Sequence, residues 1–271
     1  MTDRSRPISG IASPDVQRIA ASGGIAVQPI GAVEQHGPHL PVTTDATVAE
    51  ALAIGAVAKL PASLPAWILP TLPFGLSPEH AGWPGTVSLS ATTLLALCLD
   101  VASGVAESGI GTLIFVNAHG GNPDLLRVVS RDIRAAFGVK AFVVHAPDLP
   151  LPTELRERMP HPELDVHAGF YETSVMLALD PDSVALDDAA ADGLAVLGPL
   201  ADQRRISLFG DVSLPWQTGE LSASGVIGDP TGADAAWGHA ALDAQTTVLA
   251  ETIEELATFE YPPLGGSGNP S

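Results

Sequence analysis

Residues Gly31–Asp45 read Gly-Ala-Val-Glu-Gln-His-Gly-Pro-His-Leu-Pro-Val-Thr-Thr-Asp and gather several ligand-type side chains into one short stretch. The apolar run Ile25–Ile30 precedes it and predicts a buried strand that leads into this stretch. In an extended segment, residues two apart face the same way, so Glu34 and His36 can present an oxygen and a nitrogen to one point. This spacing is typical of metal ligands.

The residues after His36 restrict the path of the chain. Gly37-Pro38 and Pro41 forbid a helix here and predict a rigid loop that brings Asp45 back to the first two ligands. A carboxylate has two oxygens and can bridge two metals about 3.5–4 Å apart, as in two-metal hydrolases. The alternative is a polar surface loop in which Asp45 caps the helix that follows.

The overall composition narrows the class of protein. The chain has 271 residues and a formal net charge of −19, from 31 acidic and 12 basic side chains, which argues against a nucleic-acid or anionic-membrane partner. Its length suits one large α/β domain, which we place at residues 1–260, followed by a flexible tail at 261–271. The N-terminus lacks the apolar core of a signal peptide, and no apolar span reaches about 18 residues, so we expect a cytoplasmic protein.

Segments of strand and helix character alternate along the chain. The expected strands are residues 25–30, 67–70, 112–116 and 140–145, and the expected helices are residues 14–21, 45–60, 91–109, 123 onward, 169–179 and 232–258. Residues 182–224 are expected to be irregular. The alternation favours right-handed crossovers and a mainly parallel sheet that helices cover on both faces.

Two of the predicted strands end in ligand-type side chains. Glu34 and His36 directly follow one strand and His119 directly follows another, and ligands of such sheets gather beyond the carboxyl ends of the strands. We therefore expect these distant segments to converge at one edge of the sheet. Gly120 and Gly121 let the backbone after His119 pass close to a metal or a substrate. The alternative is that His119 is a histidine in a tight turn.

A third group lies between His167 and Glu172, at the start of the helix predicted for residues 169–179. Glu172 is the candidate that completes the ligands of a second metal, while His167 is the candidate general acid or base near the scissile bond. Tyr171, next to Glu172, is expected to contact the substrate. A glutamate in the first turn of a helix can also merely complement the helix dipole.

The loop at residues 71–86 is longer than most connections in compact domains, and such loops are often functional. Its Glu79 and His80 are candidates for contact with the substrate. His39 is expected to support the metal ligands or to form a local hydrogen bond. The sequence identifies no partner for the remaining histidines, which are His145, His161 and His239.

The motifs of several other catalytic classes are absent from the sequence. It contains no Gly-x-Ser-x-Gly elbow, no Walker-type phosphate loop and no Rossmann glycine fingerprint. Cys98, the single cysteine, lies in an apolar run where we expect it to be buried and its thiolate to be disfavoured. A water activated by metal is therefore the predicted nucleophile.

These motifs together resemble the creatininase (creatinine amidohydrolase) family. The matching blocks occur in the family's order over roughly residues 10–255, and they are Glu34–Pro41 with Asp45, Glu79–Thr86, Asn117–Asn122, His167–Ser174 and Gly225–Thr231. The resemblance implies a three-layer α/β sandwich with a mainly parallel central sheet, assembled as a homo-hexamer. It also implies a centre of two divalent ions, zinc or manganese, with Fe2+ as a further option.

The resemblance assigns roles to individual residues by their position in these blocks. It implies that Glu34 and His119 hold one metal, that His36 holds the other and that Asp45 bridges the two. His167 matches the catalytic histidine of the family.

The chain departs from creatinine-cleaving members of the family at two places. Those members carry Tyr and Glu directly after the histidine that matches His119, and that glutamate binds the second metal, whereas this chain has Gly120 and Gly121. Those members also stack the substrate on a tryptophan where this chain has Glu163. The resemblance therefore implies a substrate other than creatinine, with Glu172 or water on the second metal.

The sequence thus predicts a metal-dependent amidohydrolase that cleaves an amide, cyclic amide or formamide bond of a small molecule through a metal-activated water. The Gly-Gly form also occurs in family members that deformylate a pyrimidine or cleave the mycofactocin leader peptide. A mycofactocin-type peptidase is therefore the main alternative. The second alternative is a catalytically silent, metal-binding scaffold.

Overall fold

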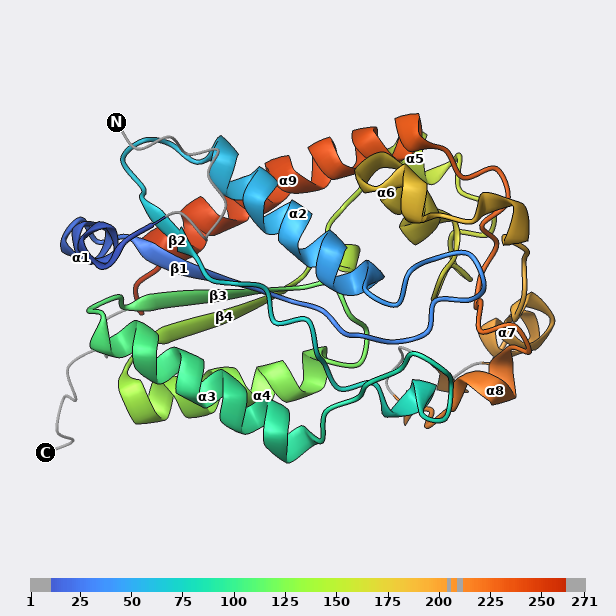
Figure 1. The fold of residues 1–271 in the computed structure, drawn as a ribbon, viewed down its shortest axis with the longest axis horizontal. Coiled ribbons are helices and arrows are strands. Elements are labelled where there is room, and N and C mark those ends of the chain that lie inside the picture. The colour runs from blue at the N-terminus through green and yellow to red at the C-terminus, as the bar shows by residue number, and fades with distance from the viewer. Residues whose placement is uncertain (1–10, 204–205, 209–211, 262–271) are drawn as a thin grey trace, which may run out of the picture.

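The computed structural model describes residues 11–203, 206–208 and 212–261, and its central feature is a four-stranded sheet (Figure 1). The strands lie in the order β2-β1-β3-β4, and all of the neighbouring pairs are parallel. Their bounds are β1 Ile25–Ile30, β2 Ala66–Ile68, β3 Thr112–Asn117 and β4 Lys140–His145. The predicted parallel sheet is confirmed, although β2 is shorter than the segment 67–70 expected for it.

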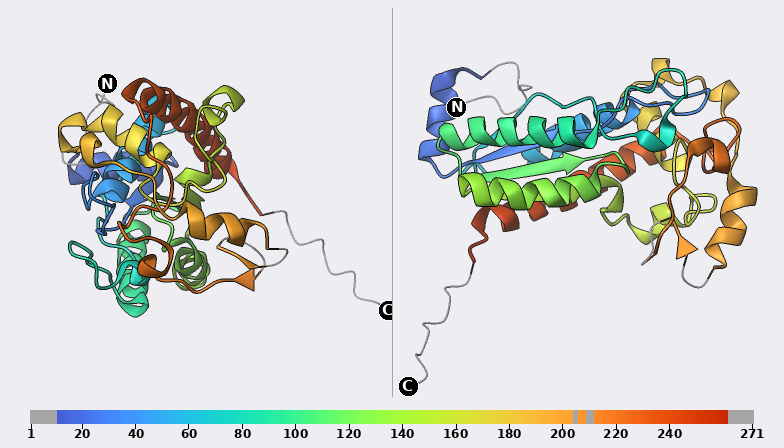
Figure 2. Two further views of the ribbon diagram at one scale, coloured as in Figure 1. Left: turned by 90° about the vertical axis from the view of Figure 1, so that its right-hand side faces the viewer. Right: turned by 90° about the horizontal axis from the view of Figure 1, so that it is seen from below.

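The two central strands are buried along their whole length because helices cover both faces of the sheet. The helices α2, α6 and α9 lie on one face and α3 and α4 on the other (Figures 1 and 2). Their bounds are α2 Thr44–Lys59, α3 Ala91–Glu107, α4 Pro123–Phe137, α6 Phe170–Leu179 and α9 Ala235–Thr258. The three-layer α/β sandwich is confirmed.

Alternate residues of the central strands enter different cores, as the two-residue period of a strand requires. Val27 and Ile114 face the core beneath α2 and α9, where Trp237 is the largest fully buried side chain. Ala26 and Phe115 face the core beneath α3 and α4, which also buries Cys98. The predicted burial of Cys98 is therefore confirmed.

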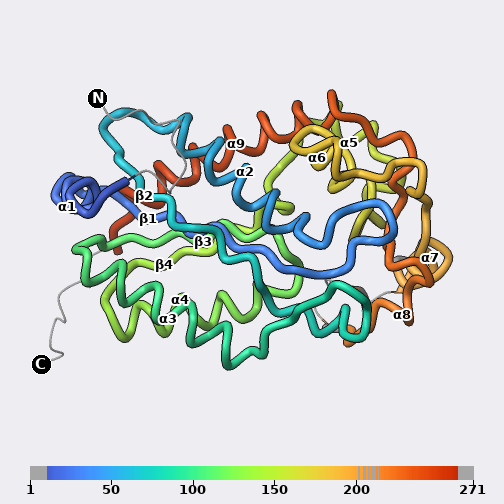
Figure 3. The backbone as a smooth tube through the Cα atoms, in the orientation of Figure 1, coloured from blue at the N-terminus to red at the C-terminus, as the bar shows by residue number. Residues whose placement is uncertain are grey.

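The register of the sheet aligns the ends of the strands that carry the candidate residues. Ile30 at the end of β1 pairs with Asn117 at the end of β3, and Asn117 pairs in turn with His145 at the end of β4. The segments that follow these strands, together with the loop after β2 and the start of α6, gather beyond this edge (Figure 3). Side chains from distant parts of the sequence thereby meet at one end of the sheet.

Between residues 182 and 224 the chain has more regular structure than its sequence predicted. The segment contains α7 (Leu194–Ala201), α8 (Thr218–Leu221) and a small sheet of β5 (Ile206–Ser207) and β6 (Val212–Ser213). The expectation of irregular structure was wrong for α7, because this helix contains Gly198 and Pro199, which usually break helices. The remaining elements are α1 (Ser13–Ala21), α5 (Thr153–Arg156) and single turns of 3-10 helix at Pro78–His80, Ala146–Asp148, Pro181–Ser183 and Leu186–Asp188.

The helix ends differ from the expected ones by a few residues. The start of α9 lies at Ala235 because the Asp234 side chain accepts a hydrogen bond from the Trp237 backbone and caps the helix there. No helix in the part of the chain that the structure describes has the length and apolar character needed to cross a bilayer. The tail predicted to be flexible lies outside the described residues, except for Tyr261.

The crossing of α6 and α9 depends on Gly238, which predicts a strong effect of a single methyl group. A Cβ at Gly238 would lie 1.9 Å from the Ser174 carbonyl oxygen and 3.0 Å from Ala178 Cβ. We expect Gly238→Ala to lower the free energy of unfolding by about 1–3 kcal/mol, measured by urea denaturation, because α9 must shift away from α6.

The matched control is Gly104→Ala in the last turn of α3, where nothing lies within 4 Å of the added Cβ. This change is expected to raise the free energy of unfolding by about 0.5–1 kcal/mol, since alanine favours the helix and restricts the unfolded chain. Equal effects of the two substitutions would contradict the close contact between α6 and α9.

Candidate active site

A cavity of about 1030 Å³ lies beyond the carboxyl ends of β1, β3 and β4. Such a position is the usual ligand site of an open parallel sheet. The side chains that line it include Glu34, Asp45, His80, His119, His167 and Glu172. Within this wall, three overlapping groups of carboxylates and imidazoles are close enough to hold metal ions.

The first group consists of Glu34, Asp45 and His119. The Nδ1 atom of His119 lies 3.3 Å from Glu34 Oε2 and 3.1 Å from Asp45 Oδ2. The Nε2 atom of His119 lies 2.9 Å from the Leu76 carbonyl oxygen, so it carries the ring proton and donates it there. Nδ1 therefore faces the two carboxylates, and once it has lost its proton its lone pair is directed as in a metal-binding histidine.

The second group consists of His36, His167 and Glu172, and Asp45 lies beside it. The Nε2 atom of His36 lies 3.1 Å from Asp45 Oδ1 and 3.9 Å from Glu172 Oε2. The Nδ1 atom of His36 is 3.1 Å from the Glu34 carbonyl oxygen, which accepts its proton. Asp45 therefore places one oxygen in the first group and directs the other at His36 of the second group.

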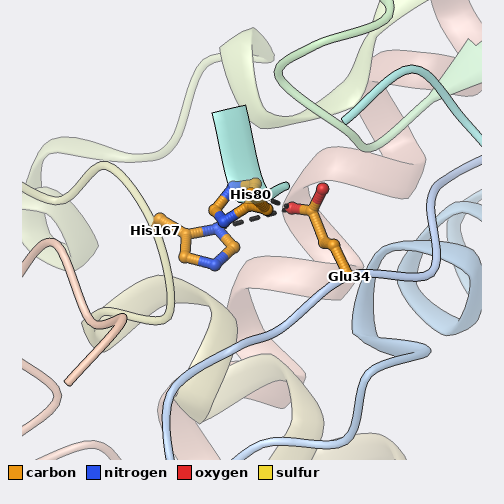
Figure 4. Close-up of side chains that lie close together, drawn as sticks. All are labelled: Glu34, His80 and His167. Atoms are coloured by element: carbon orange, nitrogen blue, oxygen red, sulfur yellow. Dashed lines mark ion pairs between the residues drawn. The ribbon is translucent and has the colours of Figure 1, made fainter. Parts of the chain in front are cut away.

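The third group joins His80 and His167 to the other oxygen of Glu34 (Figure 4). Glu34 Oε1 lies 3.5 Å from His80 Nε2 and 3.6 Å from His167 Nδ1. The ring of His167 packs between those of His80 and His36, with centroid separations of 4.3 Å to each and ring planes tilted by 37° and 40°. His167 Nε2 donates to the Gln35 carbonyl oxygen at 2.7 Å, so its Nδ1 is free to accept a proton.

Burial and opposite charges shift the pKa values of the first two groups in different directions. Burial alone would raise the pKa of Glu34, but His119, His167 and His80 hold this pKa well below its usual value. Burial would also lower the pKa of His36, yet Asp45 and Glu172 raise it to about 10. The pKa of His119 is raised in the same way, mainly by Glu34 and Asp45. In the metal-free chain, protons on His36 and His119 therefore balance the carboxylates.

The imidazoles of the third group remain neutral. Burial and the positive charge of His36 lower the pKa of His167 well below its usual value, and they lower the pKa of His80 to about 4. A neutral histidine with a fixed tautomer suits proton transfer, because it can accept a proton without first losing one.

Two buried oxygens point to a cation at the first group. Among the residues that the structure describes, Glu34 Oε2 and Asp45 Oδ2 are buried and lack a hydrogen-bond partner of good geometry. Burying such oxygens is costly unless they are paired with a charge or a metal. The residues present therefore fit a metal ion between Glu34, Asp45 and His119.

A pair of asparagines that sequence reasoning missed holds this part of the site together. The Asn122 amide donates to the Gly31 carbonyl oxygen at 3.1 Å and to Asn117 Oδ1 at 2.9 Å, and it accepts from the Leu76 backbone at 2.9 Å. Asn117 Nδ2 donates to the His119 carbonyl oxygen at 2.7 Å. The signals in the sequence were the position of Asn117 at the end of a predicted strand and the block Asn117–Asn122, which begins and ends with these two residues.

The start of α6 also depends on a residue that the sequence analysis did not single out. Asp165 accepts hydrogen bonds from the backbones of Phe170 and Tyr171 at 2.8 and 3.0 Å, and so caps the helix. Ala168 has a φ of 52°, which is unusual for a residue with a side chain, and its N–H donates to Glu172 Oε2 at 2.6 Å. The cap and this turn together direct Glu172 toward His36.

The residues predicted to contact the substrate lie in different environments, and only some of them face the cavity with a free polar group. Glu79 Oε1 lies 3.6 Å from His119 Nε2, and His80 is buried inside the centre rather than exposed on its loop. The Tyr171 hydroxyl donates to Gln245 Oε1 on α9 at 2.7 Å, so this group is occupied within the protein. A Cβ at Gly121 would lie 2.2 Å from the Leu76 carbonyl oxygen, so close packing of the backbone already requires a glycine there.

His39 contacts the helix that carries Glu172 rather than a candidate ligand or a near neighbour in sequence. Its Nε2 atom lies 2.9 Å from the Thr173 hydroxyl on α6, next to Glu172. Burial and the charge of His36 lower the pKa of His39 to about 4, so its ring is neutral. His39 thereby connects the loop of the first ligands to the helix that carries Glu172.

Comparison with known proteins places this fold and site in a family. The family profile described as Creatinine amidohydrolase matches residues 9–253. The chain belongs to the creatininase family. The predicted family resemblance is thus confirmed, and the chain is a hydrolase that acts on carbon–nitrogen bonds, as members of the creatininase family are.

Relatives within the creatininase family differ in the substrates that their names state. A mycofactocin precursor peptide peptidase of Mycolicibacterium smegmatis is 33% identical over 233 residues, which cover 85% of each chain. A creatinine amidohydrolase of Pseudomonas putida is 28% identical over 262 residues, which cover 91% of this chain and 93% of that protein. A solved structure described as "Creatininase Mn" has a TM-score of 0.73 at 25% identity, and the match covers 92% of this chain and 97% of that one.

The raised pKa of Glu172 predicts how the stability of the metal-free protein depends on pH. Burial and the neighbouring Asp45 raise this pKa from 4.5 to about 7, against the opposing effect of His36. The folded chain therefore binds more protons than the unfolded chain between these values, and the free energy of unfolding falls as the pH rises through this window. Glu172→Gln cannot titrate and should remove a loss on the order of 1–3 kcal/mol.

Urea unfolding of both proteins with a chelator present, at about pH 4.5 and about pH 8, measures this difference. The stability of Glu172→Gln is expected to exceed that of the wild type at the higher pH and to match it more closely at the lower pH. The same pH dependence in both proteins would contradict the burial of an ionisable carboxyl group at this position.

Proposed function

We propose that this protein is a metal-dependent peptidase of the creatininase family, which hydrolyses a carbon–nitrogen bond of a short peptide. The observation that carries the proposal is the position of Asp45, whose Oδ1 atom faces the imidazole of His36 and whose Oδ2 atom faces that of His119. Glu34 and His119 would complete the first metal site, and His36 and Glu172 the second. The unpaired oxygens of Glu34 and Asp45 support this assignment.

The chemistry of the donors favours a transition metal. Imidazole nitrogens with carboxylate oxygens suit Zn2+, Mn2+ and Fe2+, whereas a site for Ca2+ or Mg2+ would consist of oxygens. When bound, two such ions supply a water whose pKa is close to neutral and polarise the carbonyl that is attacked. The homo-hexamer implied by the family resemblance remains part of this proposal.

His167 is the residue that we assign to proton transfer. Its Nε2 proton is held by the Gln35 carbonyl oxygen, so its Nδ1 atom accepts a proton from the attacking water and passes it to the leaving nitrogen. The lowered pKa of His167 keeps Nδ1 unprotonated before the reaction. The ring of His167 is packed between the rings of His36 and His80, and this packing keeps its Nδ1 atom facing Glu34.

The size of the cavity supports a peptide as the substrate. Pockets that enclose drug-sized ligands measure about 300–1,000 Å³, and this cavity of about 1030 Å³ is slightly larger than that range. The similarity to a mycofactocin precursor peptide peptidase supports the same substrate class. The second candidate is a small amide, cyclic amide or formamide, which the similarity to a creatinine amidohydrolase favours.

Removal of the bridging carboxylate tests the metal centre. We expect Asp45→Asn to lose both metals and to lower kcat/KM by more than about 100-fold, because loss even of a group that only supports a ligand costs about 10–100-fold. Elemental analysis of the purified proteins measures the metal content, and thermal unfolding verifies that the variant folds. An active variant without metal would contradict the mechanism.

A panel of substrates tests the peptide assignment and separates the alternatives. The panel contains a mycofactocin precursor peptide, creatinine, a formamide and a dipeptide, each incubated with protein loaded with Zn2+ or Mn2+. We expect cleavage of the peptide, with loss of activity on chelation and recovery when metal returns. Hydrolysis of a small amide alone would select the second candidate, and inactivity on the whole panel would favour a metal-binding scaffold.

A further inference from the structure

His145 lies at the end of β4, at the same edge of the sheet as the candidate ligands. It pairs in register with Asn117 and lines the cavity together with His119 and Glu172. The mechanism described above gives it no role, and the sequence suggested no partner for it. Its hydrogen bonds nevertheless determine which atom of the ring faces outward.

The orientation of the neighbouring amides follows from backbone groups. The Leu76 N–H can only donate, so its partner in Asn122 is the oxygen, and the Asn122 nitrogen then donates to the Gly31 carbonyl and to Asn117 Oδ1. Asn117 Nδ2 consequently donates to the His119 carbonyl oxygen at 2.7 Å and to His145 Nδ1 at 2.8 Å. This chain of bonds leaves one tautomer for the neutral ring of His145, in which Nδ1 accepts and Nε2 carries the proton.

Within the part of the chain that the structure describes, the proton on Nε2 of His145 has no acceptor. No described residue forms a hydrogen bond with this Nε2 atom. The atom is also not among the fully buried polar atoms that lack a partner. Burial lowers the pKa of His145, so the ring is neutral and Nε2 presents one N–H donor. A donor that is fixed in direction and free of internal partners, on the wall of a substrate cavity, is suited to binding an acceptor of the ligand.

We propose that His145 is a substrate-binding residue, whose Nε2–H donates a hydrogen bond to a carbonyl or carboxylate oxygen of the peptide. This inference rests on the proposed peptidase function and adds a determinant of specificity to it. Because the imidazole is neutral and held by Asn117 rather than by a metal ligand's side chain, its contribution is to binding rather than to proton transfer.

Kinetics with the mycofactocin precursor peptide test the proposal. Loss of one neutral hydrogen bond in His145→Ala should raise KM about three- to tenfold, with kcat within about twofold of the wild type and the metal content unchanged. His145→Gln retains an N–H donor and should recover part of the loss. A peptide with an amidated C-terminus distinguishes the two oxygens, because only a bond to the terminal carboxylate should weaken with it.

Two results would overturn the inference while the peptidase function stands. One is an unchanged KM in His145→Ala, and the other is a loss of metal or of kcat, which would indicate a structural role. Nitrogen NMR of protein with 15N-labelled histidine provides a readout that does not depend on turnover, and the Nδ1–H tautomer of His145 would also overturn it. A wild type that cleaves no peptide contradicts the proposed function itself, and this inference with it.

Discussion

Two carboxylates are buried side by side in this structure, and the residues around them must supply positive charge. Glu34 and Asp45 are only 1% and 2% exposed, and the effective cost of burying each ion is several kcal/mol unless opposite charge stands beside it. In the metal-free chain, protonated His36 and His119 supply that charge. Divalent ions would supply more of it at the same place, and the imidazoles would then become ligands on losing their protons. The centre is therefore stable only when positive charge lies inside it.

Close approach of backbones, more than contact between side chains, keeps these groups in position. A Cβ at Gly31 would lie 2.4 Å from the Ala46 nitrogen, so a glycine is required where the end of β1 meets the start of α2 beside Asp45. The Asn122 amide ties the same Gly31 to the loop at Leu76 and to the end of β3. The ligands thus belong to segments whose backbones cannot move apart independently, and a ligand geometry fixed in this way needs little reorganisation when a metal binds.

Local patterns predicted the strands, the long helices and the ligand-type residues, because the two-residue period, the apolar runs and the Gly-Pro loop are all encoded by neighbours in sequence. The supporting residues could not be predicted in this way. Gln35 reaches a histidine 132 positions later, and Asn122 reaches a glycine 91 positions earlier, so neither role exists until the sheet has aligned its strands. His145 likewise has no partner until β3 and β4 pair.

Gly120 and Gly121 affect both the ligands available to the proposed metal centre and the space in the cavity that they line. A Cβ there would lie 2.2 Å from the Leu76 carbonyl oxygen and 2.7 Å from Glu79 Oε1, so a larger residue would displace the loop that carries both. Glycine offers no carboxylate to the second site from this position, and Glu172 on α6 takes that place in our proposal. Nothing lies within 4 Å of a Cβ at Gly120, so this part of the wall stays open. In our proposal, this open part of the wall at Gly120 accommodates the peptide substrate, while Gly121 allows the close packing of the loop behind it.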